Sequence, residues 1–489
     1  MKPFPLALAS LLISTPLAAE IQPADVMASW QRFYGAFGTE ILIGNTEIDG
    51  NITRYNNVLT QSSMGGAEIR QRIDWINMQE NADGSISITF PESFSGTSFV
   101  ELPDGKTTSV STTYTLLDLS LLARGDPDDI RFSYSTSFVI MNQSQQSPAG
   151  DMDMQMVLSG LQGETRSSFG TDDLAQQTGS QTYESASLTV DSEKTNRLNL
   201  QAGAGEMRYQ AVLPINGSSQ TPTSLPENLV LEFDMQTGDL ALDFTQGKPG
   251  SEGVFTYSQN SATIDFSLNE GTFSYGFTLN DATMELRNSA EGAPNFSAGF
   301  ASVMLGLSFP YQQSEIPAPF SVSTRITDFT LGEDLWAKFD PESQLGPAPA
   351  SFGFSISGEL KMLVDIFAGP SLGNIRKTPA ELRSISLDAL NLEFDGLGVT
   401  GRGAVTFDNA RTDPASGLPE PTGVLEFSAN GALALLDKIG RLGVLDPMVI
   451  IGAKGAFGMF ATPDSEPDSF STRIEFSNGG VVVNGQTIR

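Results

Sequence analysis

The chain contains 489 residues, of which 39% are hydrophobic, and it contains neither histidine nor cysteine. These absences exclude imidazole-based catalysis, thiol chemistry, disulfide bonds and metal sites that need histidine or thiolate ligands. The 58 acidic residues outnumber the 27 basic residues and give a formal net charge of −31, which argues against nucleic acid as a partner because its phosphates would be repelled.

Residues 1–19 have the pattern of a secretory signal peptide. Lys2 supplies a positive charge, an apolar stretch runs from Phe4 to Leu17, and Ala18 and Ala19 precede Glu20. We therefore expect cleavage after Ala19 and a periplasmic mature chain. The alternative is an uncleaved membrane anchor, which the short apolar stretch disfavours because a spanning helix needs about 20 apolar residues.

Two β-rich regions are expected behind this segment. The first covers residues 20–213 and starts with a helix over 25–37, where apolar residues recur at helical spacing. Residues 142–187 are rich in Ser, Gln, Thr and Gly, a composition typical of a loop. Residues 214–228 contain three prolines and no apolar period, so we interpret them as a linker to a second region over 229–489.

Alternation of apolar and polar residues predicts strands from about residue 85 onward. The longest example is Ile130–Ile140, and residues 229–244 and 264–279 have the pattern of two hairpins. Met284 and Leu286 indicate a further short strand, and the chain ends in a hairpin turning at Asn478-Gly479. We predict a mainly β fold, an extended or curved antiparallel sheet built from hairpins, with a few capping helices.

Three helical patterns lie in the second region. Thr330-Leu331-Gly332-Glu333 has the spacing of a capping box and predicts a helix near 330–340. Residues 359–367 predict another short helix. Residues 432–460 predict a C-terminal helical hairpin, whose second helix has Asp446 as N-cap and Pro447 at its first position.

No motif identifies a catalytic, cofactor-binding or metal-binding residue, so we predict no such site. Asp151-Met152-Asp153 has the D-x-D form of some metal sites, but its alternation with methionines favours a solvated strand face. Asp126, Asp128 and Asp129 crowd one turn, yet Ser137 stands where a calcium loop of EF-hand type needs glutamate. An acidic turn that keeps strand edges apart is the favoured interpretation, and a weak calcium site is the alternative.

Two apolar features have alternative interpretations. The aromatic residues Phe273, Tyr275 and Phe277 share one strand face and could either belong to a core or line a ligand groove. The 432–460 region could bind a membrane or lipid, but its repeated glycines favour close packing on a neighbouring element. Those glycines are Gly440, Gly443, Gly452, Gly455 and Gly458.

Residues 435–489 resemble the C-terminal signature of a family of exported bacterial proteins known as domain of unknown function 2125. The long alternating strands are also similar in style to AsmA-like envelope proteins, whose elongated β-grooves handle lipids. Neither resemblance implies a catalytic or ligand-binding residue. The matching elements are Leu435-Leu436-Asp437, Leu445-Asp446-Pro447, Gly458-Met459-Phe460-Ala461 and Asn484-Gly485-Gln486.

We expect a non-enzymatic protein whose sheet forms a platform or groove for lipid or another apolar envelope ligand, with at most peripheral membrane association. One alternative is a carboxylate-based hydrolase of envelope polysaccharide, which needs two carboxyl groups about 5–10 Å apart in a cleft. The other alternative is a structural or interaction partner in an envelope complex, which needs an exposed apolar patch of several hundred Å².

Overall fold

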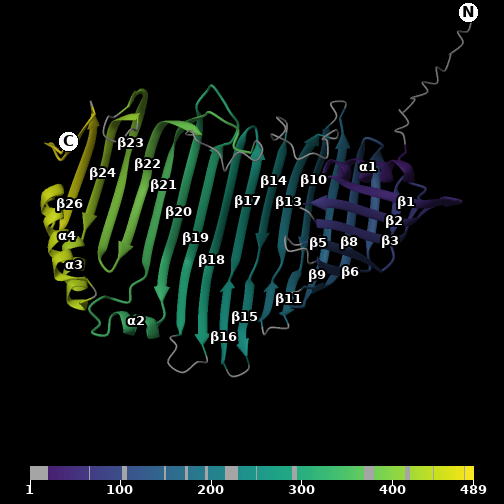
Figure 1. The fold of residues 1–489 in the computed structure, drawn as a ribbon, viewed down its shortest axis with the longest axis horizontal. Coiled ribbons are helices and arrows are strands. Elements are labelled where there is room, and N and C mark those ends of the chain that lie inside the picture. Colours follow the sequence, from purple (N-terminus) through teal and green to yellow (C-terminus); the bar gives the residue numbers. More distant parts are fainter. Residues whose placement is uncertain are drawn as a thin grey trace, which may run out of the picture.

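The computed structural model describes residues 20–488 except 65–66, 102–106, 148–149, 171–173, 193–195, 215–228, 249–250, 289–294, 368–378, 413–418, 444 and 478. Within these residues, 28 strands form one sheet and four helices lie beside it (Figure 1). The prediction of a mainly β, antiparallel fold is confirmed. The expected signal peptide and most of the expected linker lie outside the described residues.

The strands succeed one another along the sheet in close to chain order. The first nine are β1 (Thr39–Asp49), β2 (Ile52–Met64), β3 (Ala67–Glu80), β4 (Ile86–Thr89), β5 (Ser93–Glu101), β6 (Thr107–Leu117), β7 (Ser120–Asp126), β8 (Asp129–Gln146) and β9 (Met152–Phe169). The middle of the sheet contains β10 (Leu174–Tyr183), β11 (Ser185–Ser192), β12 (Asn196–Ala202), β13 (Gly205–Pro214), β14 (Val230–Thr237), β15 (Leu240–Lys248), β16 (Ser251–Gln259), β17 (Ser261–Asn269) and β18 (Thr272–Asn288).

The last part of the sheet is made of longer strands followed by a short C-terminal hairpin. These strands are β19 (Phe296–Pro310), β20 (Ala318–Leu331), β21 (Ala350–Met362), β22 (Ala380–Phe394), β23 (Leu397–Thr412), β24 (Pro419–Asn430), β25 (Thr462–Pro463), β26 (Ser469–Ser477), β27 (Gly480–Val483) and β28 (Gln486–Thr487). The helices are α1 (Pro23–Ala36), α2 (Glu333–Phe339), α3 (Ala432–Leu442) and α4 (Pro447–Phe460). None of these helices is long and apolar enough to cross a membrane.

Long strands alternate with pairs of short strands laid end to end. Strand β9 pairs along one half with β10 and along the other half with β11, and β18 pairs in the same way with β17 and β16. Every pairing is antiparallel. Strand β13 pairs with β14 through Val212 and Val230, so the sheet continues across the expected linker.

The breaks between the short strands of each pair align across the sheet, along one line that runs transverse to the strands. The same line crosses the long strands, and we call it the crease. Along it, the left-handed residues Asp118, Gly160, Asp281 and Asp328 have φ angles of 55°, 59°, 51° and 52°. The pairing register is the same on both sides of it between β8 and β9, between β18 and β19 and between β19 and β20. Between β20 and β21 the register shifts by one residue, between Ile326 and Phe329. The crease residues are Asp118, Gly160, Glu184, Ala204, Gly238, Asn260, Asp281 and Asp328.

The apolar pattern of the long strands β9 and β18 changes parity at the crease. In β18, apolar residues occupy odd positions from Phe273 to Leu279 and even positions from Ala282 to Leu286. In β9, they occupy even positions from Met152 to Leu158, whereas Leu161 and Phe169 are odd. Because one residue with a left-handed conformation interrupts the pleat, both halves of a strand place their apolar side chains on the same face.

This arrangement corrects one predicted hairpin and one predicted short strand. Strands β14 and β15 do not pair with each other. They lie end to end in the sheet, so residues 229–244 do not form a hairpin. Met284 and Leu286 continue β18 and do not form a separate strand. The residues responsible are Gly238 and Asp281, which lie at the crease and resemble turn residues in the sequence. The hairpins over 264–279 and at the C-terminus are confirmed.

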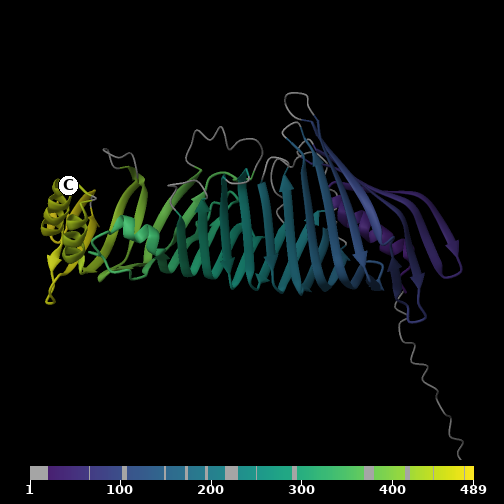
Figure 2. The same cartoon turned by 90° about the horizontal axis from the view of Figure 1, so that it is seen from below.

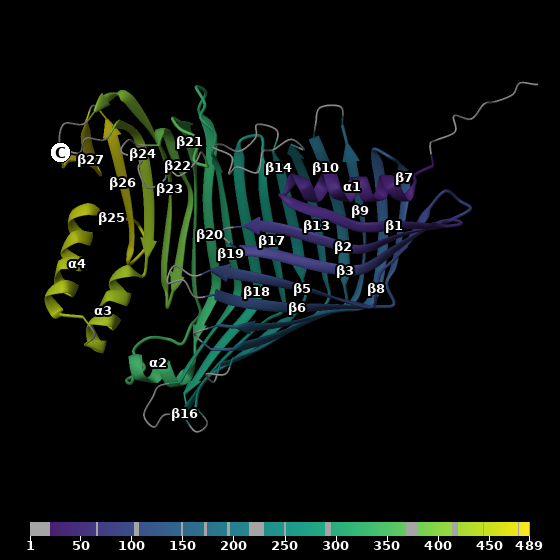
Figure 3. The same cartoon turned by 45° about the vertical axis from the view of Figure 1, so that its right-hand side comes forward.

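Helix α1 lies inside the curve of the sheet. Its Val26 and Met27 are buried against β2, β3, β4, β7 and β8. Its Phe33 packs farther along, against residues of β9, β10, β13 and β17. The N-terminal strands therefore turn away from the plane of the rest (Figure 2), and α1 lies beside them (Figure 3). The expected leading helix is confirmed, and it holds this curl in place.

The other expected helices have mixed outcomes. Helix α2 exists, but its N-cap is Gly332 and no side chain caps it, so the expected capping box is wrong. Residues 359–362 belong to β21, where pairing with β22 overrides the helical pattern expected over 359–367. The C-terminal helical hairpin is confirmed, and the Asp446 carboxylate accepts a hydrogen bond of 2.8 Å from Met448 N. The loop composition of 142–187 was misleading, because β8 to β11 fill most of it.

Candidate functional site

The most extensive feature of the molecule is the apolar face of its sheet. Side chains from successive strands form rows in direct register across this face, on both sides of the crease. One row contains Phe233, Phe266, Tyr275, Leu307, Val322 and Ile356. A second row, beyond the crease, contains Leu188, Leu200, Leu242, Tyr257 and Met284.

These side chains are only half-buried, because no second layer covers most of the face. Members of both rows have intermediate exposure, whereas the two clusters of buried apolar residues include side chains of α1. Across the sheet, 12 successive strand pairings lead from β8 to β24. At about 4.8 Å a step, the face is roughly 60 Å long. A surface of this size with half-exposed apolar side chains is typical of a binding site.

The predicted aromatic strand connects the core to this open face. The ring of Phe273 lies 5.7 Å from that of Phe266 and 5.0 Å from that of Phe309, beside the buried cluster around α1. Tyr275 and Phe277 follow on the same strand with rings 6.3 Å apart and remain half-buried. Phe273 therefore belongs to the core, as one interpretation expected, and the ligand-groove interpretation stays a prediction for Tyr275 and Phe277.

Tyrosines mark the part of the face that lies near α1. The Tyr134 hydroxyl donates a hydrogen bond of 2.8 Å to Gln181 Oε1, and the hydroxyls of Tyr209 and Thr165 lie 2.9 Å apart. Burial raises the pKa of the Tyr209 phenol above the ordinary value of 10.0. The Tyr134 and Tyr209 hydroxyls each have a hydrogen-bond partner, so neither leaves an unpaired polar group on this part of the face.

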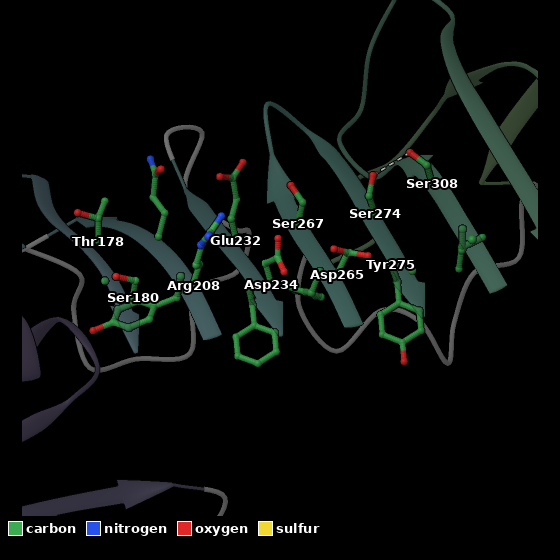
Figure 4. A pocket seen from close by; sticks show the side chains of 18 of the residues that line it. Thr178, Ser180, Arg208, Glu232, Asp234, Asp265, Ser267, Ser274, Tyr275 and Ser308 are labelled. Carbon is green, nitrogen blue, oxygen red and sulfur yellow. Dashed lines mark hydrogen bonds between the residues drawn. The ribbon is translucent and has the colours of Figure 1, made fainter. Parts of the chain in front are cut away.

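The opposite face of the sheet is polar and carries an open trough of about 940 Å³. Figure 4 shows Ser267, Ser274, Ser308 and their neighbours on one side of the strands, with Tyr275 pointing to the other side. Within the trough, the serines of β17, β18 and β19 lie opposite one another in register. Asp234 on β14 lies directly opposite Asp265 on β17.

The acidic clusters singled out from the sequence are engaged in the surface of the sheet. Asp153 lies on the exposed face of β9 while Met152 and Met154 lie on the other face, as the alternation predicted. The Arg166 guanidinium donates two hydrogen bonds of 2.6 Å to the Asp129 carboxylate. These bonds lower the pKa of Asp129 below its usual value. Within the described residues, no group of three or more acidic side chains is placed to hold a metal ion.

Helix α4 stands at the C-terminal end of the sheet with much of its apolar surface exposed. Met448 is 72% exposed and Ile451 is 62% exposed. A methyl group added at Gly452, Gly455 or Gly458 would meet nothing within 4 Å, so the close packing expected for these glycines is wrong.

No family model matches this chain. No curated protein matches it either. The likeness of residues 435–489 to the exported bacterial family therefore stays a prediction. In the structure those elements are the middle of α3, the turn before α4, the end of α4 and the turn between β27 and β28.

Sequence reasoning missed the crease, and with it the extent of the apolar face. The signal was present in the parity changes at Gly160 and Asp281, because apolar residues switch from odd to even positions within a continuous strand. Comparison of these changes across several strands would have indicated one transverse line.

Proposed function

We propose that this is a non-enzymatic periplasmic protein whose curved sheet binds lipid or another apolar envelope ligand on its apolar face. The observation that carries the proposal is the set of in-register apolar rows that no second layer covers. Burial of an acyl chain against such a face is favourable by about 0.8 kcal/mol for each methylene removed from water. The export pattern of residues 1–19 supports the location.

The proposal is tested by mass spectrometry of the mature protein, recovered from its native envelope under gentle conditions. We expect co-purified lipid that is lost from the double variant Phe277→Gln and Leu305→Gln, because these side chains are register partners on the open apolar face. The matched control is Thr278→Gln with Met304→Gln, one residue along the same strands on the opposite face. A bare wild-type protein, or equal lipid on both variants, would refute the proposal.

A second candidate function is a hydrolase of envelope polysaccharide that uses two carboxylates. It is favoured by one observation, the opposed pair Asp234 and Asp265 in the polar trough. Directly opposed residues have Cβ atoms about 5 Å apart, which is compatible with the spacing in glycosidases. Release of reducing ends from envelope polysaccharide by the wild type, and its loss in Asp265→Asn, would support this candidate; no release would exclude it.

We further propose that α4 gives the protein a peripheral contact with a membrane. The helix lies at the C-terminal end of the sheet (Figure 1), and its apolar residues Met448 and Ile451 are exposed there. Flotation with neutral phosphatidylcholine vesicles tests this contact, since the acidic chain would be repelled by anionic ones. We expect binding to be lost on Met448→Asp with Ile451→Asp and kept on Asp446→Asn.

A further inference from the structure

A separate apolar pocket of about 450 Å³ lies where α2 and α3 approach the sheet. Strand β20 contributes Phe329, α2 contributes Trp336, β22 contributes Phe394 and α3 contributes Ile439, while Leu345 comes from the segment after α2. None of the residues that line it is charged, and Thr330 and Trp336 carry its side-chain polar groups. A charged headgroup finds no partner of opposite charge there, so the pocket suits the hydrocarbon part of a molecule.

Polar contacts behind the walls hold this pocket in shape. The Asp340 carboxylate is 2% exposed and accepts hydrogen bonds of 2.7 Å from Gln344 N and 2.6 Å from Leu345 N. These bonds fix the segment that carries Leu345 into the pocket. Hydrogen bonds within the protein therefore hold this wall of the pocket.

A second set of contacts ties α3 to the sheet and to this segment. The Lys438 ammonium donates to the Asp395 carboxylate at 2.8 Å, and the same carboxylate accepts from Gly346 N at 3.1 Å. Arg441 on α3 donates to the Gln344 side chain at 2.8 Å. These hydrogen bonds hold α3, Asp395 and the segment after α2 together around the pocket.

The pocket is continuous with the apolar face described above. Phe329 and Leu331 belong to the apolar side of β20 beyond the crease, and Phe394 continues the apolar side of β22. At the rim, Phe339 is 45% exposed and Leu445 is 41% exposed. An extended hydrocarbon chain lying on the face can therefore enter the pocket without crossing a polar barrier.

We propose that this pocket receives the end of a single acyl chain of the ligand while the rest of the molecule lies on the sheet. The inference rests on the proposed function and makes it specific, because it assigns the ligand class as a lipid with at least one unbranched chain. The apolar lining, the hydrogen-bonded walls and the continuity with the face each support it.

Tryptophan fluorescence tests the pocket directly, because Trp336 lines it. In the full mature chain carrying Trp30→Phe and Trp75→Phe, the remaining Trp336 should lose at least half of its emission when a dibrominated stearate is added. The substitution Ala348→Phe fills the pocket and should abolish this quenching. The control is Ala337→Phe, since Ala337 lies on α2, faces solvent and does not line the pocket. Far-ultraviolet circular dichroism verifies that both variants fold.

The outcomes separate this inference from the proposed function. Quenching that survives Ala348→Phe overturns the pocket assignment, since the probe would then lie outside it. Absent quenching of Trp336, together with stearate bound in mass spectrometry, also overturns the pocket and leaves the proposed function standing. No bound stearate and no co-purified lipid refute both.

Discussion

Deletion of Asp281 tests whether the crease keeps the apolar side chains of a strand on one face. Asp281 has a φ angle of 51° and interrupts β18 between two runs of opposite parity. Its removal leaves β18 one residue short of β16 and β19, which keep their own interruptions at the crease. To stay paired with these neighbours, the second half of β18 must slip by one residue. Ala282, Met284 and Leu286 would then lie opposite residues of the polar face and point to that face.

The cost can be worked from the burial of these three side chains. Ala282 is 2% exposed, Met284 is half-buried and Leu286 is 40% exposed. Full burial of a Met or Leu side chain contributes about 1.5–3 kcal/mol, so partial burial contributes roughly 1 kcal/mol each, and Ala adds slightly less. We therefore expect the free energy of unfolding to fall by about 3 kcal/mol.

The assay is urea-induced unfolding followed by circular dichroism, with Asp281→Gly as the matched control. Glycine keeps the residue count and adopts the left-handed conformation without strain, although the hydrogen bond of 3.0 Å from the Asn260 side chain to Asp281 is lost. These effects offset each other, so the control should change stability by less than about 1 kcal/mol. A deletion that costs no more than the control would show that the crease does not set the face of the strand.

Two other predictions concern carboxylates with defined partners. Asp340→Ala leaves the buried amides of Gln344 and Leu345 without acceptors, and we expect a loss of about 1–3 kcal/mol in thermal unfolding, whereas a change within error would contradict the proposed role in the pocket wall. Asp129→Asn breaks a half-exposed pair with Arg166, so its cost at neutral pH should stay below about 1 kcal/mol. Because the pair lowers the pKa of Asp129 in the folded state, its contribution is present above the unfolded value of 3.8 and disappears as pH falls through the lowered value. Urea unfolding of wild type and variant should therefore differ at pH 7 and converge near pH 2, and a difference that persists at low pH would assign the effect to packing.

Local sequence patterns were sufficient for the elements whose neighbours are close in the chain. The Asn269-Glu270-Gly271 turn, with Glu270 and Gly271 at φ angles of 48° and 73°, was predictable because its two strands pair directly. The start of α4 was predictable because Asp446 and Pro447 act on the first turn of their own helix. Residues 359–362 failed because pairing with β22, distant in sequence, decides their conformation.

Alternation of apolar and polar residues determined by itself that the chain forms one-sided strands, since a period of two permits no other regular structure. Whether such a strand stops at Gly238 or continues through Asp281 depends on the neighbours to which each half pairs. Tertiary structure alone decided that the interruptions align in one crease and that α1 covers one end of the face while the rest stays open. The physical reason is that burial depends on which distant surfaces meet, and alternation along a strand contains no information about its partner.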